Sequence, residues 1–362
     1  MATHAPPGVR DRARHRVCRP PSAASPLDVQ LCQDVGQMHQ LLAAAPSTSD
    51  GTTRPSATME AATLSAGTQH LLWLVRRQGN AAKQQQHELV SVLELLAAAC
   101  ADQLPGATPT AIAEQGWALA TAAAEGECTA ALLAAPGVPH GDSRSACFAS
   151  AWLQTAGDAM QAFTPSELLM VLRAASAMSE ADAQLPAGWW AAWEAAAAPH
   201  LPRLPLGTLA KVVWEARWLD VRLGPAFLAA WLQATEAQLH ARLEPTTPDA
   251  WVPLLRSLVA LGELGVGGSV PAAWLEAWCS ASEPALAAVT APSEPDARAR
   301  AVDLLSLALW ALLELEGVPP PRWVAAWRQA MAAVAAGSGA AALSQQQQAR
   351  VERAAACWGC QV

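Results

Sequence analysis

The chain has 362 residues, of which 52% are hydrophobic and 15% charged, and this composition excludes disorder along its whole length. It contains no tyrosine, three phenylalanines and a single isoleucine, so the residues typical of large sheets are scarce and helix is favoured. The net charge of −8 argues against nucleic-acid binding through overall charge. Any such binding must therefore depend on a local group of arginines.

The first 26 residues form an arginine-rich leader with one acidic residue, Asp11. It has no apolar stretch of the secretory type, and its composition is typical of an organelle transit peptide. Its arginines are Arg10, Arg12, Arg14, Arg16 and Arg19. Because four of them alternate at every second position, they do not share one helix face. We therefore expect import into chloroplasts, with the mitochondrion as the alternative and a plain disordered terminus as the simpler interpretation.

Beyond the leader, 18 basic residues stand against 30 acidic ones, a net charge of −12. The segment 27–68 is expected to hold one helix, with Leu31, Val35, Met38 and Leu42 on one face, followed by an Ala/Ser/Thr/Pro-rich linker. Degenerate helical repeats are expected over 69–145, and better-formed ones over 146–362. The predicted interruptions are Ala43–Thr58, Asp102–Pro109, Ala134–Ser145, Ser280–Pro295 and Ala335–Gln348.

Internal repeats dominate the second half of the chain. Five times an aromatic residue is followed four positions later by tryptophan, which places both rings on one helix face. The pairs are Phe148/Trp152, Trp189/Trp193, Phe227/Trp231, Trp274/Trp278 and Trp323/Trp327. Their second members are separated by 41, 38, 47 and 49 residues. We expect these aromatic pairs to lie in the core.

A second helical pattern is expected to follow each aromatic pair, so that each repeat opens with the aromatic helix. These patterns cover Thr108–Ala120, Thr164–Met178, Leu206–Leu219, Thr247–Leu261 and Val302–Leu315. Thr-Pro at a helix start supplies an N-cap and a proline at the first helical position, and Glu167 completes a capping box with Thr164. Helix pairs that recur every 38–49 residues predict an all-α fold, an α-solenoid (superhelix) of helix-turn-helix repeats.

Short motifs in these helices have counterparts in a known family. They are Pro319-Pro-Pro-Arg-Trp323, Trp117-Ala-Leu-Ala120, Leu309-Trp310-Ala-Leu312 and Trp214. With these motifs the chain resembles the octotricopeptide repeat family of green-algal organelle proteins, which is similar in turn to the leucine-rich helical repeats of FAST-kinase-like proteins. The resemblance covers 146–362 well and 69–126 loosely. It implies sequence-selective RNA binding in the processing, stability or translation of organelle transcripts.

One column of residues is a candidate RNA-binding site. Aligning the second helices places Trp117, Arg173, Trp214, Arg256 and Trp310 at one position, with Arg353 as an extension and Lys211 on the same helix as Trp214. Tryptophan and arginine would then alternate along one face of the solenoid. Single-stranded bases stack on such surfaces. In the alternative interpretation the tryptophans fill the core and the arginines only extend from an apolar seam.

The sequence contains no enzyme motif. It has no phosphate-binding Gly-x-x-x-x-Gly-Lys-Ser/Thr, no dinucleotide-binding glycine pattern after a strand, and no histidines at metal-ligand spacing. Cys357 and Cys360 lack the second pair that a zinc site needs. No run of 18 apolar residues free of proline and charge is present to span a membrane.

The expected protein is therefore not an enzyme and has no cofactor, bound metal or small-molecule substrate. Its expected partners are single-stranded organelle RNA and a further protein of a ribonucleoprotein complex. Two alternatives stay open. One is an acidic α-solenoid scaffold that binds a basic protein and no RNA, and the other is a degenerate family member without an RNA target.

Overall fold

The computed structural model describes residues 32–43, 61–132, 147–240, 251–289, 295–336 and 344–358. The predicted leader, 1–26, lies outside the described residues, as do most of the predicted interruptions Ala43–Thr58 and Ala134–Ser145. Within the described ranges the secondary structure is helical and contains no strand. The prediction of an all-α helical-repeat solenoid is confirmed.

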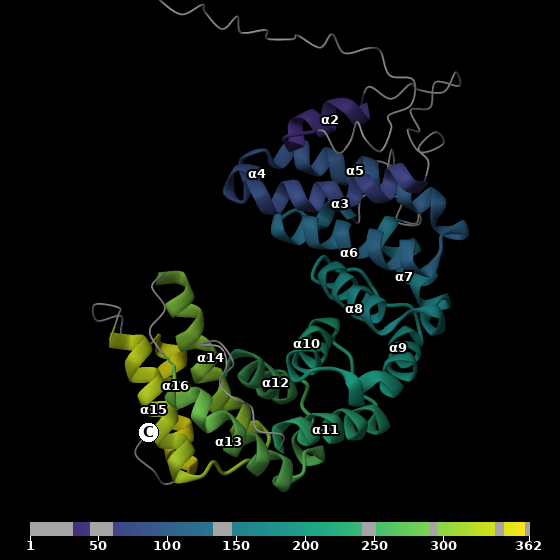
Figure 1. The fold of residues 1–362 in the computed structure, drawn as a ribbon. Helices are drawn as coiled ribbons and strands as arrows, with labels where there is room; N and C mark the ends of the chain where they lie inside the picture. The colour runs from purple at the N-terminus through teal and green to yellow at the C-terminus, as the bar shows by residue number, and fades with distance from the viewer. Residues whose placement is uncertain are drawn as a thin grey trace, which may run out of the picture.

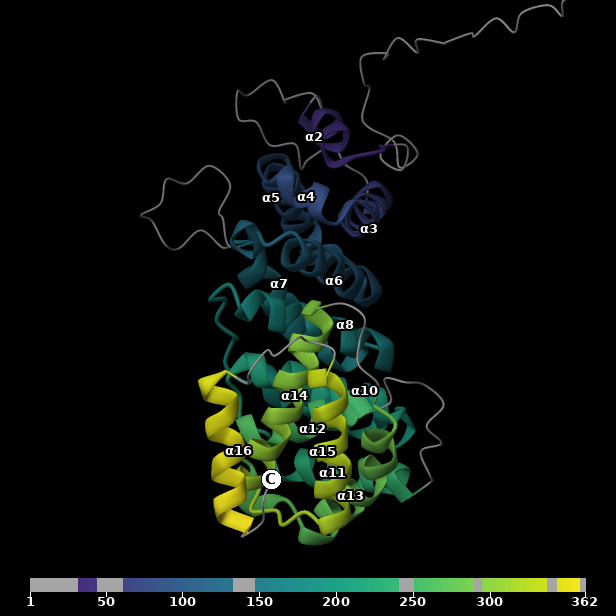
Figure 2. The ribbon, with the colours of Figure 1, turned by 90° about the vertical axis from the view of Figure 1, so that its left-hand side faces the viewer.

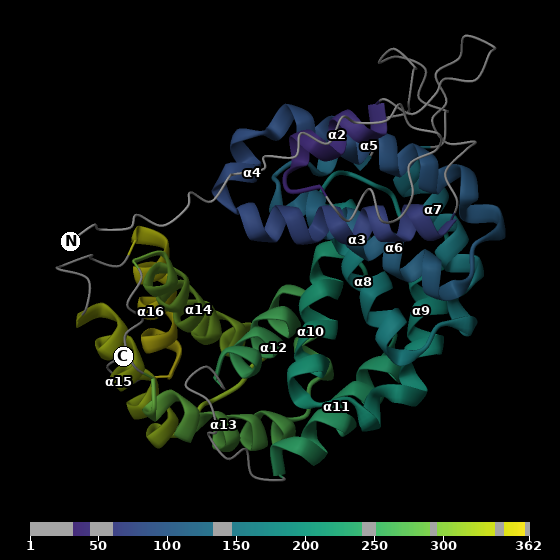
Figure 3. The same ribbon diagram turned by 45° about the horizontal axis from the view of Figure 1, so that its top comes forward.

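The helices form two layers that curve together into an arc (Figures 1 and 3). The inner layer consists of α3 (Ala61–Gln78), α6 (Pro109–Glu125), α8 (Pro165–Ser179), α10 (Leu206–Ala216), α12 (Trp251–Glu263), α14 (Pro295–Glu314) and α16 (Gln345–Trp358). The outer layer consists of α5 (Gln86–Gln103), α7 (Phe148–Asp158), α9 (Trp189–Ala197), α11 (Pro225–His240), α13 (Ala272–Ala287) and α15 (Pro321–Ala336).

Shorter elements complete the arc. The helix α2 (Val35–Ala43) packs on α5, and α4 (Asn80–Gln84) joins α3 to α5. The helices α2 to α5 and the helices α14 to α16 lie at the two ends of the arc (Figure 2). The helix α3 runs through position 69, where the sequence placed a domain boundary.

Threonine caps fix the starts of α6 and α8 as predicted. Thr108 Oγ1 accepts a hydrogen bond from Ala111 N at 3.3 Å. Thr164 and Glu167 form the predicted capping box, in which Thr164 N donates to Glu167 Oε2 at 2.7 Å. Thr110 Oγ1 of α6 also donates to Glu167 Oε1 at 2.6 Å, which links the two inner helices. These hydrogen bonds, above all that of Thr110, hold the pKa of Glu167 below its usual value.

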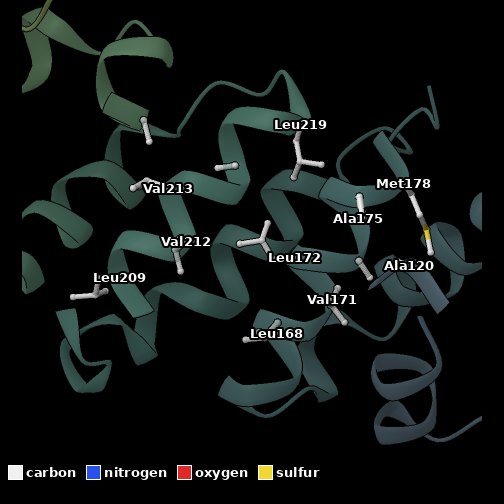
Figure 4. Packing of buried hydrophobic residues seen from close by; sticks show 14 of the residues in the cluster. Ala120, Leu168, Val171, Leu172, Ala175, Met178, Leu209, Val212, Val213 and Leu219 are labelled. Atoms are coloured by element: carbon white, nitrogen blue, oxygen red, sulfur yellow. The ribbon is translucent and has the colours of Figure 1, made fainter. Parts of the chain in front are cut away.

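Leucine and valine side chains fill the space between successive inner helices. Leu168, Val171 and Leu172 of α8 and Leu209, Val212 and Val213 of α10 are all buried at this junction (Figure 4). Each helix buries one apolar face only against its neighbours, and repeat proteins are stabilised by local contacts of this kind.

The aromatic pairs lie in the core between the two layers, as expected. The second member of each pair donates its indole N–H to a backbone carbonyl of the inner helix that precedes it. The bonds are Trp152 to Ile112 (2.8 Å), Trp193 to Leu168 (3.0 Å), Trp231 to Leu209 (2.9 Å), Trp278 to Leu254 (3.2 Å) and Trp327 to Leu305 (2.9 Å). The structural unit is therefore an inner helix and the outer helix that follows it, and the predicted order, with the aromatic helix first, is wrong.

Two first members of the pairs connect successive outer helices by hydrogen bonds. Trp274 donates to Thr235 Oγ1 at 2.9 Å, and Trp323 donates to Ser282 Oγ at 2.9 Å. Each hydroxyl lies four residues after the tryptophan of the preceding outer helix. At the junction of α7 and α9 the corresponding residue is Ala156, and the buried Trp189 Nε1 has no hydrogen-bond partner within the described residues.

The predicted interruptions Ser280–Pro295 and Ala335–Gln348 are partly helical. The helix α13 continues to Ala287, into the predicted interruption Ser280–Pro295 and through Pro284, because buried Ser282 and Leu286 pack on the core there. The helix α16 begins at Gln345, inside Ala335–Gln348. There, Ser344 N donates to Gln347 Oε1 at 3.0 Å and Gln347 N donates to Ser344 Oγ at 3.3 Å, which together form a capping box.

One described segment, Gln86–Gly106, is long and apolar enough to cross a membrane by length and composition. Its leucine face is buried, with Leu89, Leu93 and Leu96 all 0% exposed. Within this segment, α5 contacts α2, α3, α6 and α7. The segment is therefore packed as a core helix of the solenoid.

Candidate nucleic-acid interface

A groove of about 440 Å³ lies on the inner layer, across the four consecutive helices α6, α8, α10 and α12. These helices form the concave side of the arc (Figure 3). Five of the seven predicted site residues line this groove: Trp117, Arg173, Lys211, Trp214 and Arg256. The structure thus brings together residues that are separated by up to 139 positions in the sequence.

The predicted alignment of the column is wrong for Arg256. The indole-bonded carbonyls give each inner helix a common reference, and Trp117, Arg173, Trp214 and Trp310 all lie five residues after theirs. In α12 the reference is Leu254, so the equivalent residue is the buried Val259. Arg256 lies about one turn closer to the helix start, at the level of Lys211. The helix period keeps it on the same face, and it therefore still reaches the groove.

The groove carries a local excess of positive charge. Arg173, Lys211 and Arg256 are exposed, and none of them forms an ion pair within the described ranges of the chain. The groove lining includes one carboxylate, Glu215, which accepts a hydrogen bond from Ser176 Oγ at 2.6 Å. Three cations thus face one anion in a chain whose net charge is −8.

Trp214 is the groove tryptophan that contacts two arginines. The guanidinium carbon of Arg217 lies 3.3 Å from the Trp214 ring centroid, and that of Arg256 lies 5.3 Å from it. Arg217 is 10% exposed and forms an ion pair with Glu263 at 2.8 Å. Burial lowers the pKa of Arg217, and Glu263 opposes that shift. Arg217 therefore covers one face of Trp214 and holds the ring in place.

The N-terminal edge of the groove contains an arginine that the sequence analysis missed. Arg76 of α3 lies over Trp117, with its guanidinium carbon 5.7 Å from the ring centroid, and pairs with Glu125 at 3.1 Å. A signal was present in the sequence, because Arg76 precedes Trp117 by 41 residues, the same step that separates Arg173 from Trp214.

Trp310 and Arg353 do not line the groove. Trp310 is half-buried and packs over Gly262 of α12, where an added Cβ would lie 3.4 Å from the Trp310 ring. Arg353 pairs with Glu314 at 3.5 Å. The interpretation of the tryptophans as packing residues therefore fits Trp310 better than the predicted RNA-binding column does.

The described residues contain no group of three or more histidine, cysteine or acidic side chains that could hold a metal ion. Burial raises the pKa of the Cys100 and Cys279 thiols to about 12 and that of Cys128 to about 11, so these thiols stay protonated at neutral pH. Cys357 is an exposed free thiol, and Cys360 lies outside the described residues.

No protein-family model matches the chain, and no curated protein matches its sequence. Chemically, the groove offers exposed cations beside aromatic rings on a helical frame. Such a surface suits an anionic ligand that carries flat, stackable groups.

Proposed function

We propose that this chain is a non-catalytic helical-repeat protein that binds single-stranded RNA in the concave groove of α6 to α12. One observation carries the proposal: Arg173, Lys211 and Arg256 are exposed and unpaired, within the described chain, beside Trp117 and Trp214. The resemblance to octotricopeptide repeats further suggests that the bound RNA is an organelle transcript. Binding would then serve the processing, stabilisation or translation of this transcript. The same resemblance supports membership of that family.

The groove chemistry supports RNA over a neutral ligand. Arginine and lysine neutralise phosphates and release counterions, which gives affinity that falls with salt. Tryptophan offers a stacking face worth about 1–3 kcal/mol per base. Beyond the leader the net charge is −12, so acidic surfaces elsewhere repel a phosphate backbone and favour binding at the groove.

The same acidic excess favours a second candidate function, a scaffold that binds a basic protein. Salt-dependent binding of single-stranded RNA distinguishes the two. RNA affinity that falls steeply between about 50 and 200 mM salt supports the proposal, since each released counterion contributes to the slope. Absence of RNA binding at the lower salt concentration would leave the scaffold as the better account.

The residues are tested by the double substitution Arg173→Ala with Arg256→Ala. It should weaken RNA binding by about tenfold or more, because two phosphate or stacking contacts are lost. The melting temperature should stay nearly unchanged, since both side chains are exposed. The matched control replaces two exposed arginines of the outer surface, Arg203 and Arg328, with alanine. A destabilised groove variant with unchanged RNA affinity would assign Arg173 and Arg256 a packing role instead.

The proposed compartment has its own test. Residues 1–45, fused to a fluorescent protein, should direct import into chloroplasts, with mitochondria as the alternative destination. Replacing Arg10, Arg12, Arg14, Arg16 and Arg19 with glutamine provides the control, because a transit peptide depends on its positive charge. A diffuse cytosolic signal from the unaltered fusion would remove the organelle from the proposal without affecting the groove.

A further inference from the structure

We infer that the RNA footprint is short: the groove holds a single-stranded segment of about four nucleotides, through three phosphate contacts and one or two stacked bases. This inference rests on the proposed function and specifies its ligand. It differs from the predicted column of tryptophans and arginines, which would contact the RNA strand at every repeat. The reason is that Arg76 on the N-terminal side of the groove, and Arg350 and Arg353 on its C-terminal side, already form ion pairs with carboxylates of the protein.

On the N-terminal side, the first inner helix within the described residues is α3. Arg76 forms an ion pair with Glu125 at 3.1 Å while it lies over Trp117, so its charge is compensated within the protein. Arg77 packs over the ring of Trp73, 4.9 Å from its centroid, and neither residue lines the groove. A strand that extended past Trp117 would meet a neutral pair rather than a free cation.

On the C-terminal side, the two arginines of α16 form ion pairs with carboxylates of α14. Arg353 pairs with Glu314 at 3.5 Å, and Arg350 pairs with Asp303 at 3.2 Å. Trp310 rests on Gly262, at a site where the two helix backbones approach closely enough that an added Cβ would lie 3.0 Å from Ala311. The pattern of aromatic and basic residues continues in the sequence, but Arg350 and Arg353 form ion pairs between helices.

The stacking capacity of the groove is limited too. Arg217 lies 3.3 Å from the centroid of Trp214 and covers one face of this ring, and Arg256 lies 5.3 Å from the same centroid, so Trp214 offers a base one face at most. Trp117 is half-buried and has Arg76 beside it at 5.7 Å. Two tryptophans with one usable face each accommodate no more than two bases. The three cations without an ion pair within the described residues, Arg173, Lys211 and Arg256, would each contact one phosphate of the bound segment.

Length and salt dependence test this footprint together. Fluorescently labelled oligouridylates of about 2, 4, 6, 8 and 12 nucleotides are titrated with the full chain at several salt concentrations. Affinity should rise with oligonucleotide length up to about four nucleotides. For longer strands it should rise only in proportion to the number of positions at which the groove can bind along the strand. Three phosphate contacts on a single strand predict a slope of log K against log salt of about −2.

Three single variants locate the contacts. Arg173→Gln, Lys211→Gln and Arg256→Gln should each make the slope shallower by about 0.7, the contribution of one phosphate on a single strand. Arg353→Gln is the matched control and should leave both slope and affinity unchanged, because Glu314 already neutralises this arginine.

The inference is overturned if affinity per nucleotide keeps rising beyond about eight nucleotides, or if the slope is steeper than about −3. It is also overturned if Arg353→Gln lowers affinity as much as Arg256→Gln does. In these cases RNA binding, and with it the proposed function, would stand. If no oligonucleotide binds at the lowest salt concentration, the proposed function fails and this footprint fails with it.

Discussion

The tryptophans of the two helix layers have the same side chain and opposite surroundings. In the outer layer, Trp152, Trp193 and Trp231 are 0% exposed, and each donates its indole N–H to a backbone carbonyl. In the inner layer, Trp117 and Trp214 are only half-buried and lie under arginines. The comparison shows that the outer tryptophans fix the distance between layers, whereas the inner ones leave part of a ring beside a groove. The following predictions test this difference, from the largest expected effect to the smallest.

Removing an outer tryptophan should have the largest effect. Trp231→Ala deletes a fully buried ring and its bond to Leu209, and should cost about 3–5 kcal/mol of stability. Trp117→Ala, at a half-buried position of the inner layer, should cost only about 1–2 kcal/mol and should weaken RNA binding. Urea denaturation followed by circular dichroism measures both. Equal losses of stability in the two variants would mean that the layers do not differ in this way.

Removing the hydroxyl that serves an outer tryptophan should have a smaller effect. Ser282→Ala leaves the buried Trp323 N–H without its acceptor and should lower stability by about 1–3 kcal/mol. Ser280→Ala, an exposed position on the same helix, is the control and should change little. An unchanged melting temperature for Ser282→Ala would show that this hydroxyl does not stabilise the junction between α13 and α15.

The reverse substitution should stabilise the protein. Ala156 occupies the position that Thr235 and Ser282 hold in later repeats, and the neighbouring Trp189 N–H is unpaired within the described chain. Ala156→Ser supplies an acceptor and should raise stability by about 0.5–1.5 kcal/mol, the net value of one hydrogen bond. The gain should disappear when Trp189 is replaced by phenylalanine, which has no N–H. A gain that persists in Trp189→Phe would have another origin.

The link between α6 and α8 should depend weakly on pH. Hydrogen bonds from Thr110 and Thr164 lower the pKa of Glu167, so the ionised carboxylate stabilises the folded state above the unfolded pKa. This stabilisation is lost as pH falls through the lowered folded pKa. Thr110→Val should therefore be less stable than the unaltered chain at pH 7, and the two should converge in acid. Thermal melts across the pH range measure this, and a difference that does not change with pH would contradict it.

Local signals in the sequence predicted much of the fold. The aromatic pairs, four residues apart, identified the outer helices and their buried face. The capping box of Thr164 and Glu167 gave the start of α8 correctly. The start of α16 was missed although Ser344 and Gln347 form the same kind of motif, because a run of glutamines resembles a low-complexity segment.

The candidate site was predicted less completely, for a physical reason. Whether an arginine is free depends on carboxylates of the neighbouring helix, and these lie tens of residues away. Arg353 and Glu314 are 39 residues apart, so no local pattern shows that they pair. The register of Arg256 was missed because Arg256 lies eight residues after Pro248, just as Trp117 and Arg173 lie eight residues after Pro109 and Pro165. The bond from Trp278 to the Leu254 carbonyl, which sets the register of α12, cannot be read from this spacing.

Photo-crosslinking tests the central claim most directly, because it locates bound RNA on the protein. A short single strand that contains 4-thiouridine is bound to the full chain, irradiated and digested, and the crosslinked peptides are identified by mass spectrometry. We expect crosslinks in α6, α8, α10 and α12, centred on the peptides of Trp117 and Trp214. Arg173→Ala with Arg256→Ala should reduce them by about tenfold. Crosslinks on the outer layer, or mainly on α14 and α16, would contradict the groove as the RNA site.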